Sequence, residues 1–308
     1  MTSPDLDCVV VGGGAAGLSA ALVLGRARRR VLLVDEGRQS NLSAHAVGGL
    51  LGHDGTSPAD LYRIGRAQLA ALPTVAVRDG RVTDARRNDG GFTVELEAGA
   101  PVRAARLLLA VGLTYQLPDL PGLAELWGDS AFHCPFCHGW EVRDRRLALY
   151  AGDRADVIEH LGSLLRGWSD DVVAFADEAA ATPTARAALE AAGVALVTTP
   201  VTALRAEGGT LAAVVLADGS EVPRDAIAVA WTPRPRSDLA ARLGAASDER
   251  GLVRVDRMGA TDVPGLFCAG DACEPFQQVS VAIASGAMAG AAVAREAIID
   301  RYAVPTAS

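Results

Sequence analysis

LDCVVVGGGAAGLSAALVLGRARRRVLLVDEG, residues 6–37, combines two apolar segments, a glycine-rich turn and a segment rich in alanine and leucine. This order predicts a strand, a tight turn, a helix and a second strand within about thirty residues, which is the βαβ unit of a dinucleotide-binding fold. We expect Gly12 to permit the turn, Gly14 to let a pyrophosphate approach the helix N-terminus, and Gly17 to let helix and strand pack closely. Asp35, the last residue of the second strand, is placed to accept hydrogen bonds from an adenosine ribose.

The composition is that of a globular chain of 308 residues, half hydrophobic, with a formal net charge of -8. That length accommodates two domains of ordinary size. Because the longest basic patch is Arg28–Arg30, we expect no nucleic acid partner and no membrane partner. The N-terminus lacks the basic and apolar regions of a secretory signal, so we expect a cytoplasmic location. The apolar stretch 281–293 is too short for a membrane span and is interpreted as a packed helix.

Later segments repeat the βαβ pattern and then return to the first domain. A buried strand ends at Gly112, and prolines near 118 and 121 mark a crossing. A second strand, turn and helix follow from about residue 145, and GLFCAGDA then gives a strand and the Gly270-Asp271 turn before a long helix of small residues. The predicted fold is α/β, with two Rossmann-like, three-layer ββα dinucleotide-binding domains. The first comprises 1–116 and 244–308, and the second, 117–243, is inserted into it.

The fragment AFHCPFCHGWE, residues 131–141, holds Cys134 and Cys137 with a histidine on each side, His133 and His138. This spacing occurs in c-type haem attachment sites, in zinc clamps and in redox-active dithiols. Covalent haem attachment requires export, and no second cysteine pair or H-x-x-x-H motif completes a zinc site, so we expect no metal. We favour the redox dithiol.

The remaining cysteines are few. Cys8 and Cys268 lie in predicted apolar strands, where we expect them to be buried small hydrophobes. Cys273 follows the Gly270-Asp271 turn, and its role stays open.

The GGGAAG turn, the Ala-Val-Gly strand end, the C-x-x-C inside the inserted domain and GLFCAGDA before the last helix together resemble the low-molecular-weight thioredoxin reductase family of FAD proteins. The resemblance covers essentially the whole chain. It implies FAD in the first domain and a homodimer. The residues that it assigns to the cofactor are Gly12, Gly14, Gly17 and Asp35 at the ADP half, Val82 beside the adenine, Gly112 near the cofactor, Gly270 and Asp271 at the ribitol, and Gln278 and Val279 at the flavin N1/O2 edge.

The same resemblance assigns roles around the cysteines. Cys137 would face the flavin and Cys134 the substrate. His138 stands where the reductases carry an acid that moves protons, and a histidine suits that role because its unperturbed pKa lies near 6.5. His133 is a second candidate. Both histidines are also compatible with solvated loop positions.

The second turn departs from the pattern of family members that use a pyridine nucleotide. A tyrosine replaces the first glycine of the turn, two acids fall in the place of a His-Arg-Arg cluster that binds the 2'-phosphate of NADPH, and a threonine replaces a glycine near the nucleotide. The residues concerned are Tyr150, Gly152 and Ala155 in the turn, Ala176, Asp177 and Glu178 in the cluster, and Thr232. We therefore expect that NADPH and NADH are not used. Asp177 keeps one alternative open, since an acid after the second strand holds the ribose in NAD-specific folds.

A subset of the family shares a histidine-flanked C-x-x-C and an eroded nucleotide site: the dithiol oxidases that close disulfides in natural products such as gliotoxin and holomycin. HCPFCHGWE is similar to their motif. The resemblance implies that a small-molecule or peptide dithiol reduces the Cys134–Cys137 disulfide, that electrons pass from Cys137 to FAD, and that oxygen becomes hydrogen peroxide. Two alternatives stay open: a disulfide reductase of thioredoxin or a small disulfide, fed by NADH, NADPH or ferredoxin, and a flavin-binding redox sensor that controls a partner.

Overall fold

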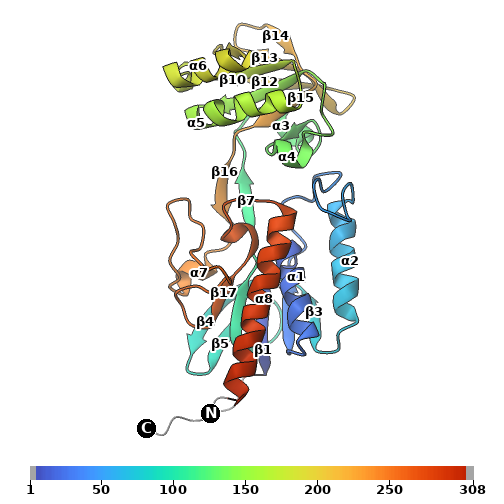
Figure 1. Cartoon of the computed structure of the whole chain (residues 1–308), viewed down its shortest axis with the longest axis vertical. Helices are drawn as coiled ribbons and strands as arrows, with labels where there is room; N and C mark the ends of the chain where they lie inside the picture. The colour runs from blue at the N-terminus through green and yellow to red at the C-terminus, as the bar shows by residue number, and fades with distance from the viewer. Residues whose placement is uncertain (1–4, 303–308) are drawn as a thin grey trace. The chain divides into compact units, whose positions relative to one another are not determined.

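The structure of the chain is a computed structural model that describes residues 5–302. The chain divides into two compact units, Met1–Leu42, Thr56–Thr114 and Pro233–Ser308 forming unit 1, and Ser43–Gly55 and Tyr115–Thr232 forming unit 2 (Figure 1). The two later crossings between the units run through β7 (Leu113–Gln116) and β16 (Thr232–Pro235), which pair as a two-stranded sheet. The predicted α/β fold with two Rossmann-like halves is confirmed.

Unit 1 is built on a seven-stranded sheet of order β3-β2-β1-β6-β5-β4, with β17 on β6. Strands β3, β2, β1, β6 and β17 run parallel, and the β4–β5 hairpin continues the sheet antiparallel. The bounds are β1 Leu6–Val11, β2 Val31–Asp35, β3 Val75–Asp79, β4 Val82–Asn88, β5 Gly91–Leu96, β6 Val102–Leu109 and β17 Leu266–Cys268.

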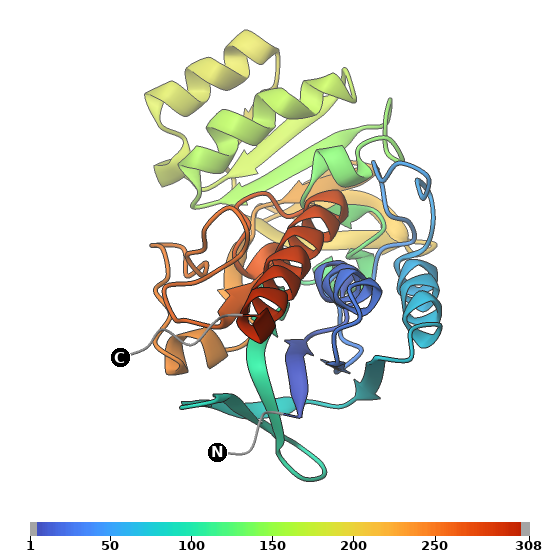
Figure 2. The same ribbon diagram turned by 60° about the horizontal axis from the view of Figure 1, so that its bottom comes forward.

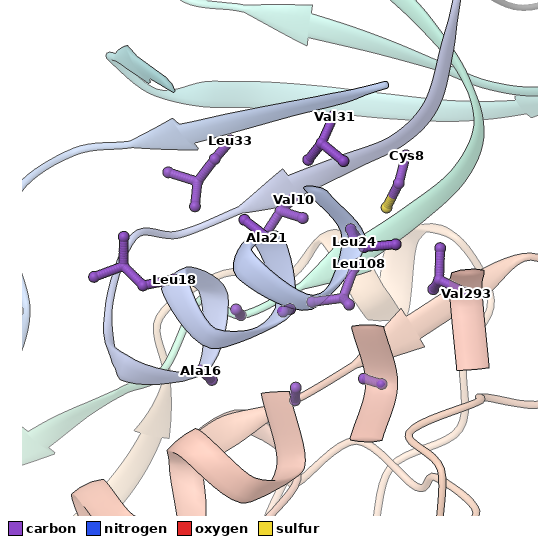
Figure 3. Packing of buried hydrophobic residues seen from close by; sticks show 14 of the residues in the cluster. Cys8, Val10, Ala16, Leu18, Ala21, Leu24, Val31, Leu33, Leu108 and Val293 are labelled. Atoms are coloured by element: carbon purple, nitrogen blue, oxygen red, sulfur yellow. The ribbon is translucent and has the colours of Figure 1, made fainter. Parts of the chain in front are cut away.

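Alternate residues of each strand face opposite sides of this sheet and build two cores. On one side, Val10 and Leu33 pack against α1 (Ala15–Arg26), α2 (Pro58–Ala70) and α8 (Val279–Tyr302) (Figure 3). On the other side, Val9 and Val11 pack with the hairpin and with α7 (Leu239–Arg242). The sheet is therefore covered by α1, α2 and α8 on one face and by the segment around α7 on the other.

Helices α1 and α8 cross in unusually close contact (Figure 2). A Cβ added to Gly286 would lie 2.1 Å from the carbonyl oxygen of Ala16, and one added to Gly290 would lie 2.7 Å from that of Ala20. The Ser19 hydroxyl donates to the Ile283 carbonyl across the contact at 2.8 Å. Helix α8 is 24 residues long and, by length and composition alone, apolar enough to span a membrane. The expectation of a segment too short for a span considered only residues 281–293 and is therefore wrong. Helix α8 packs into the core of unit 1, as expected.

Unit 2 is built on a five-stranded parallel sheet of order β11-β10-β9-β15-β8, beside a β12-β13-β14 antiparallel meander. Helical segments cover one face, with Leu149 and Leu189 among the buried residues, and the meander covers the other. The bounds are α3 Leu123–Leu126, β8 Ala131–Phe132, α4 Pro135–His138, β9 Leu147–Gly152, α5 Ala155–Val157, β10 Val172–Ala176, α6 Pro183–Ala192, β11 Ala195–Val197, β12 Val201–Glu207, β13 Thr210–Leu216, β14 Glu221–Pro223 and β15 Ala226–Val229.

The unit boundaries differ from the predicted domains in three places, of which the smallest is residues 115–116, predicted in the first domain and found in unit 2. Residues 233–243 belong to unit 1, because Arg236 donates to the carbonyls of Arg38 and Leu113 and because Leu239 is buried in the hairpin-side core. Residues 43–55, here called the strap, belong to unit 2 although the chain on both sides belongs to unit 1.

Candidate functional site

The first glycine turn of unit 1 has the geometry that its sequence predicts. Gly12 has φ +103°, and a Cβ there would lie 2.2 Å from the carbonyl oxygen of Ala110. A Cβ on Gly17 would lie 1.8 Å from the Gly12 carbonyl oxygen, which explains the close packing of α1 on β1. Gly14 caps α1, and a Cβ there would meet only Gln39, at 3.6 Å. The space in front of the helix N-terminus therefore stays open to a ligand.

Asp35 ends β2 as predicted, and it is only 5% exposed. Its carboxylate accepts hydrogen bonds from the Gly13 N–H at 3.0 Å and from Gln39 Nε2 at 3.1 Å. Arg66 Nη2 lies 2.5 Å from Asp35 Oδ2 and bridges to Asp79. The sequence reasoning missed Gly13, Gln39 and Arg66. The run of three glycines is a sequence signal for Gly13, whereas no local pattern indicates Gln39 or Arg66.

A cavity of about 440 Å³ opens beside this carboxylate. Its lining comes from the ends of β2 and β3, from the turn before β4 and from the residue after β5, and the residues are Asp35, Glu36, Gly37, Arg38, Asp79, Gly80, Arg81 and Glu97. Val82, expected beside an adenine, is buried at the first position of β4, next to the lining residue Arg81. A cavity of this volume at the carboxyl ends of parallel strands suits a nucleoside.

The other predicted cofactor residues also lie in unit 1. Gly112 has φ +66°, and a Cβ there would meet nothing within 4 Å. Gly270 donates its N–H to the Ser285 hydroxyl of α8 at 2.9 Å. Burial raises the pKa of the Asp271 carboxyl to about 6, against the opposing influence of Arg236. Gln278 immediately precedes α8, which begins at Val279, and its carbonyl accepts the Ala282 N–H. A largely buried carboxylate suits the hydroxyl groups of a polyol, with which it can form hydrogen bonds.

The two cysteines of unit 2 form a disulfide at the one-turn helix α4. Cys134 caps α4, Cys137 lies within it, and their Cα atoms are 5.3 Å apart. The N–H groups of Cys137 and His138 both donate to the Cys134 carbonyl at 3.1 Å. The pair is therefore in the oxidised state of a dithiol–disulfide couple.

Both flanking histidines are held largely out of water. Burial, and secondarily the charge of His138, lower the pKa of His133 to about 4, so this imidazole is neutral at pH 7. Burial also lowers the pKa of His138, although Glu141 and Asp129 oppose the shift. A neutral imidazole can accept a proton. Of the two histidines, His138 is the better base, because the carboxylates of Glu141 and Asp129 stabilise its imidazolium.

His133 sits within an aromatic cluster that the sequence reasoning missed. Its ring centroid lies 4.6 Å from that of Tyr115, 5.3 Å from that of Trp231 and 5.7 Å from that of the stacked Trp127. The cluster is assembled from segments far apart in the chain, and no local pattern signals it. His133 is therefore fixed by packing and not a mobile loop residue.

The second turn, at the end of β9, is covered by a tyrosine ring. A Cβ added to Gly152 would lie 3.8 Å from Tyr150 Cε1 and Oη, so the ring folds over the turn. Burial raises the pKa of Tyr150, and the carboxylates of Asp177 and Asp153 raise it further. The turn thus presents an aromatic ring and two acids at the place where a pyrophosphate would need glycine and open N–H groups.

The residues after β10 are also acidic. Asp177 N–H donates to the Gly152 carbonyl at 2.8 Å, and the exposed Glu178 pairs with Arg186 at 2.6 Å. Thr232 lies at the start of β16 and Ala155 at the start of α5. Two acids, Asp177 and Glu178, therefore stand directly after β10.

The sequence family described as pyridine nucleotide-disulphide oxidoreductase matches residues 6–286. The chain belongs to this family. It is 32% identical to thioredoxin reductase sirT of Leptosphaeria maculans, covering 95% of this chain and 94% of that protein, and 29% identical to thioredoxin reductase tcpT of Claviceps purpurea, covering 97% and 96%. The crystal structure of HlmI matches with a TM-score of 0.91 at 36% identity, covering 98% and 95%, and that of the putative thioredoxin reductase TrxB from Bacillus anthracis matches with 0.90 at 28%, covering 96% and 99%.

Membership makes the chain an oxidoreductase acting on sulfur, from a family that binds FAD. Unit 1 fits that cofactor, because it combines the open Gly14 and Gly112 positions, the cavity beside Asp35 and the largely buried Asp271. The structure gathers the ten predicted cofactor residues in unit 1 and the four predicted catalytic residues in unit 2. Cys8 and Cys268 are buried as expected, and burial raises the pKa of Cys8 to about 12. A hydrogen bond with Cys268, followed by burial, raises the pKa of Cys273, so this thiol is a poor nucleophile.

Proposed function

We propose that the protein is an FAD-dependent dithiol oxidase that forms a disulfide in a small molecule or peptide and passes the electrons to oxygen. The observation that carries the proposal is the combination, within unit 2, of a redox disulfide at Cys134–Cys137 with a nucleotide turn that Tyr150 covers. A reductase needs a donor of electrons, and the tyrosine ring and the acids at this turn support the proposal that no nicotinamide nucleotide binds there. A dithiol substrate supplies the electrons itself.

The chemistry of the pair follows from its residues. A substrate thiol gives its proton to a base, for which we propose His138, and the resulting thiolate attacks the sulfur of Cys134. The Cys134–Cys137 bond breaks, and Cys137 leaves as a thiolate. The second substrate thiol then displaces Cys134 from the mixed disulfide, so that the substrate leaves oxidised and the pair is reduced. Bound FAD would accept the two electrons of the pair and deliver them to oxygen, giving hydrogen peroxide.

Two exposed aromatic side chains beside the pair support a small apolar or peptide substrate. Phe136 lies between the cysteines and is 55% exposed, and Trp140 follows α4 at 67% exposure. Trp140 carries the Arg143 guanidinium 3.9 Å from its ring centroid. Aromatic faces of this kind bind apolar and cationic groups. We further propose a homodimer, from the resemblance alone, and a cytoplasmic location.

The test is the electron donor. Under anaerobic stopped-flow, dithiothreitol should bleach the flavin while NADPH and NADH leave it oxidised, and admitting oxygen should restore the colour with hydrogen peroxide formed. Asp177, in the ribose-holding position, favours an NADH-linked reductase as the second candidate. Rapid bleaching by NADH would establish that candidate. Slow turnover with every dithiol and reductant, together with a redox-dependent partner complex, would instead indicate a sensor.

A further inference from the structure

The Asp35 carboxylate already accepts hydrogen bonds from three groups of unit 1. Its Oδ1 accepts from the Gly13 N–H at 3.0 Å and from Gln39 Nε2 at 3.1 Å. Its Oδ2 accepts from the same Gln39 nitrogen at 3.1 Å and from Arg66 Nη2 at 2.5 Å. An ionised carboxylate offers about four lone-pair sites on its two oxygens. A ribose diol that bonds to Asp35 must therefore displace one of these donors.

The three donors are held to different degrees. Gly13 donates from the backbone of the glycine turn, where a Cβ would lie 2.5 Å from Asp35 Cγ. Arg66 is charged, and its Nη1 also pairs with Asp79 at 2.7 Å. Hydrogen bonds between two charged groups are stronger than those of a neutral amide. Gln39 is neutral and divides one nitrogen between two oxygens, so it is the donor that leaves at the least cost.

The Gln39 side chain also lies in front of the N-terminus of α1. Gly14 caps this helix, and a Cβ on Gly14 would lie 3.6 Å from Gln39 Cγ. The N-terminus of a helix is where a phosphate approaches the backbone in a dinucleotide fold. One side chain thus stands at both the ribose acceptor and the phosphate position.

The backbone on both sides of Gln39 is anchored. The Arg38 carbonyl accepts a hydrogen bond from Arg236 Nη1. The Asn41 side chain accepts a hydrogen bond from the Tyr62 hydroxyl of α2 at 2.7 Å. The Gln39 amide can therefore leave Asp35 by rotation about its own side-chain bonds, while the loop keeps its place.

We infer that Gln39 sets the affinity of unit 1 for its cofactor, because its amide competes with the adenosine ribose for the Asp35 carboxylate. The two ribose hydroxyls donate to the oxygens that Gln39 Nε2 bridges, so binding exchanges one neutral donor for two. The loss of the Gln39 contact offsets part of the gain from the diol. The inference rests on FAD as the cofactor and on Asp35 as its ribose ligand, and not on the proposed dithiol reaction.

The test uses ADP and its dideoxy analogue, which lacks both ribose hydroxyls. Gln39→Ala removes the competing donor, so the full chain freed of FAD should bind ADP about tenfold more tightly, about the worth of one hydrogen bond. Binding of the dideoxy analogue should stay in place, because that ligand leaves the carboxylate to Gln39. Titration calorimetry measures both dissociation constants. The dissociation constant of FAD, followed by flavin fluorescence, should fall together with that of ADP.

Two further variants separate the hydrogen bond from other effects. Gln39→Met keeps the length of the side chain but has no donor, so it should strengthen ADP binding as Gln39→Ala does. Gln68→Ala is the matched control, because it removes the same residue type from an exposed position of α2. It should leave the dissociation constants of both ligands unchanged.

An ADP affinity that is unchanged or lower in Gln39→Ala would overturn the inference, because Gln39 would then be idle or a ligand of the nucleotide. An equal gain for the dideoxy analogue would also contradict it, since Gln39 would then hinder binding by its bulk beside Gly14. These titrations contain no thiol and no electron donor. If the proposed dithiol reaction failed, the dependence of the Gln39 effect on the diol would still stand.

Discussion

Unit 1 and unit 2 share a design, a parallel strand followed by a turn and a helix, and they differ at the turn. In unit 1, Gly12 makes the turn and α1 follows as a regular helix of 12 residues without an acid in its first turn. In unit 2, Tyr150 covers the turn, and α5 has three residues, carries Asp156, and continues into π-helical residues 158–162. The two units therefore differ at the turn and at the start of the helix, the parts that hold the pyrophosphate in folds of this kind.

If unit 2 contributes only the redox pair, loss of either cysteine should abolish turnover while unit 1 keeps a full complement of FAD. Cys134→Ser leaves the Cys137 thiolate, which by resemblance lies against the flavin, and we expect a long-wavelength charge-transfer band at neutral pH. Cys137→Ser should lack the band. A charge-transfer band in Cys137→Ser alone would reverse the assignment of the two cysteines. Loss of FAD in either variant would contradict the premise that unit 2 contributes only the redox pair.

The two turns can be compared by the same substitution. Gly12 has φ +103°, and Gly12→Ala places a methyl group against the Ala110 carbonyl. We therefore expect the free energy of unfolding to fall by about 3–5 kcal/mol and the variant to retain no FAD. Gly152→Ala, at φ +56° with its nearest neighbour 3.8 Å away, should cost about 1–2 kcal/mol and leave FAD content and turnover in place. Absorbance at 450 nm per chain and thermal unfolding measure both. Equal FAD loss would contradict the comparison.

Reopening the second turn should require more than one change. Tyr150→Gly removes the ring but leaves Asp153 and Asp177, so NADPH should still fail to bleach the flavin. Adding Asp177→Ala and Glu178→Arg should strengthen NADPH binding by at least about tenfold, since each charge contact is worth about 1.4 kcal/mol or more. Titration calorimetry with NADPH measures this. Tight binding by the single variant would show that the acids do not oppose the nucleotide.

A further expected effect concerns Asp271, because burial raises the pKa of its carboxyl from the ordinary 3.8 to about 6. The folded apoprotein binds more protons than the unfolded chain between these values, so its stability falls as pH rises from about 4 to about 6. The cost persists at neutral pH and reaches about 3 kcal/mol at most. Asp271→Asn should therefore raise the melting temperature of the apoprotein at pH 7 and change it little near pH 4, while it weakens FAD binding. An unchanged melting temperature at pH 7 would contradict this.

Local signals predicted the parts of the fold that depend on local physics. The end of β2 at Asp35 and the Gly270-Asp271 turn are where the sequence places them, because glycine turns and apolar periodicity act over a few residues. The sequence predicts that the chain returns to the first domain at residue 244, whereas unit 1 resumes at Pro233, within β16. The hydrogen bonds of Arg236 to the carbonyls of Arg38 and Leu113 hold this segment on unit 1, and they join residues far apart in the sequence.

The site was predictable to the extent that it lies in motifs. The C-x-x-C pair, the first glycine turn and the odd residue Tyr150 are all visible in the sequence. The strap and the aromatic cluster around His133 are not, because each depends on contacts between distant segments, such as Gly48 with Cys137 and Tyr115 with Trp231. Such contacts follow from tertiary packing and leave no periodic trace.

The close crossing of α1 and α8 has a consequence for the order of events during synthesis. Ala16 and Gly286 touch, so the first helix made by the ribosome waits for the last one before its apolar face is covered. The segments of unit 2 emerge earlier and can fold before unit 1 closes. A chain interrupted before α8 would thus carry a finished redox pair but no closed pocket for the flavin, and yellow colour becomes a sign that translation reached the last helix.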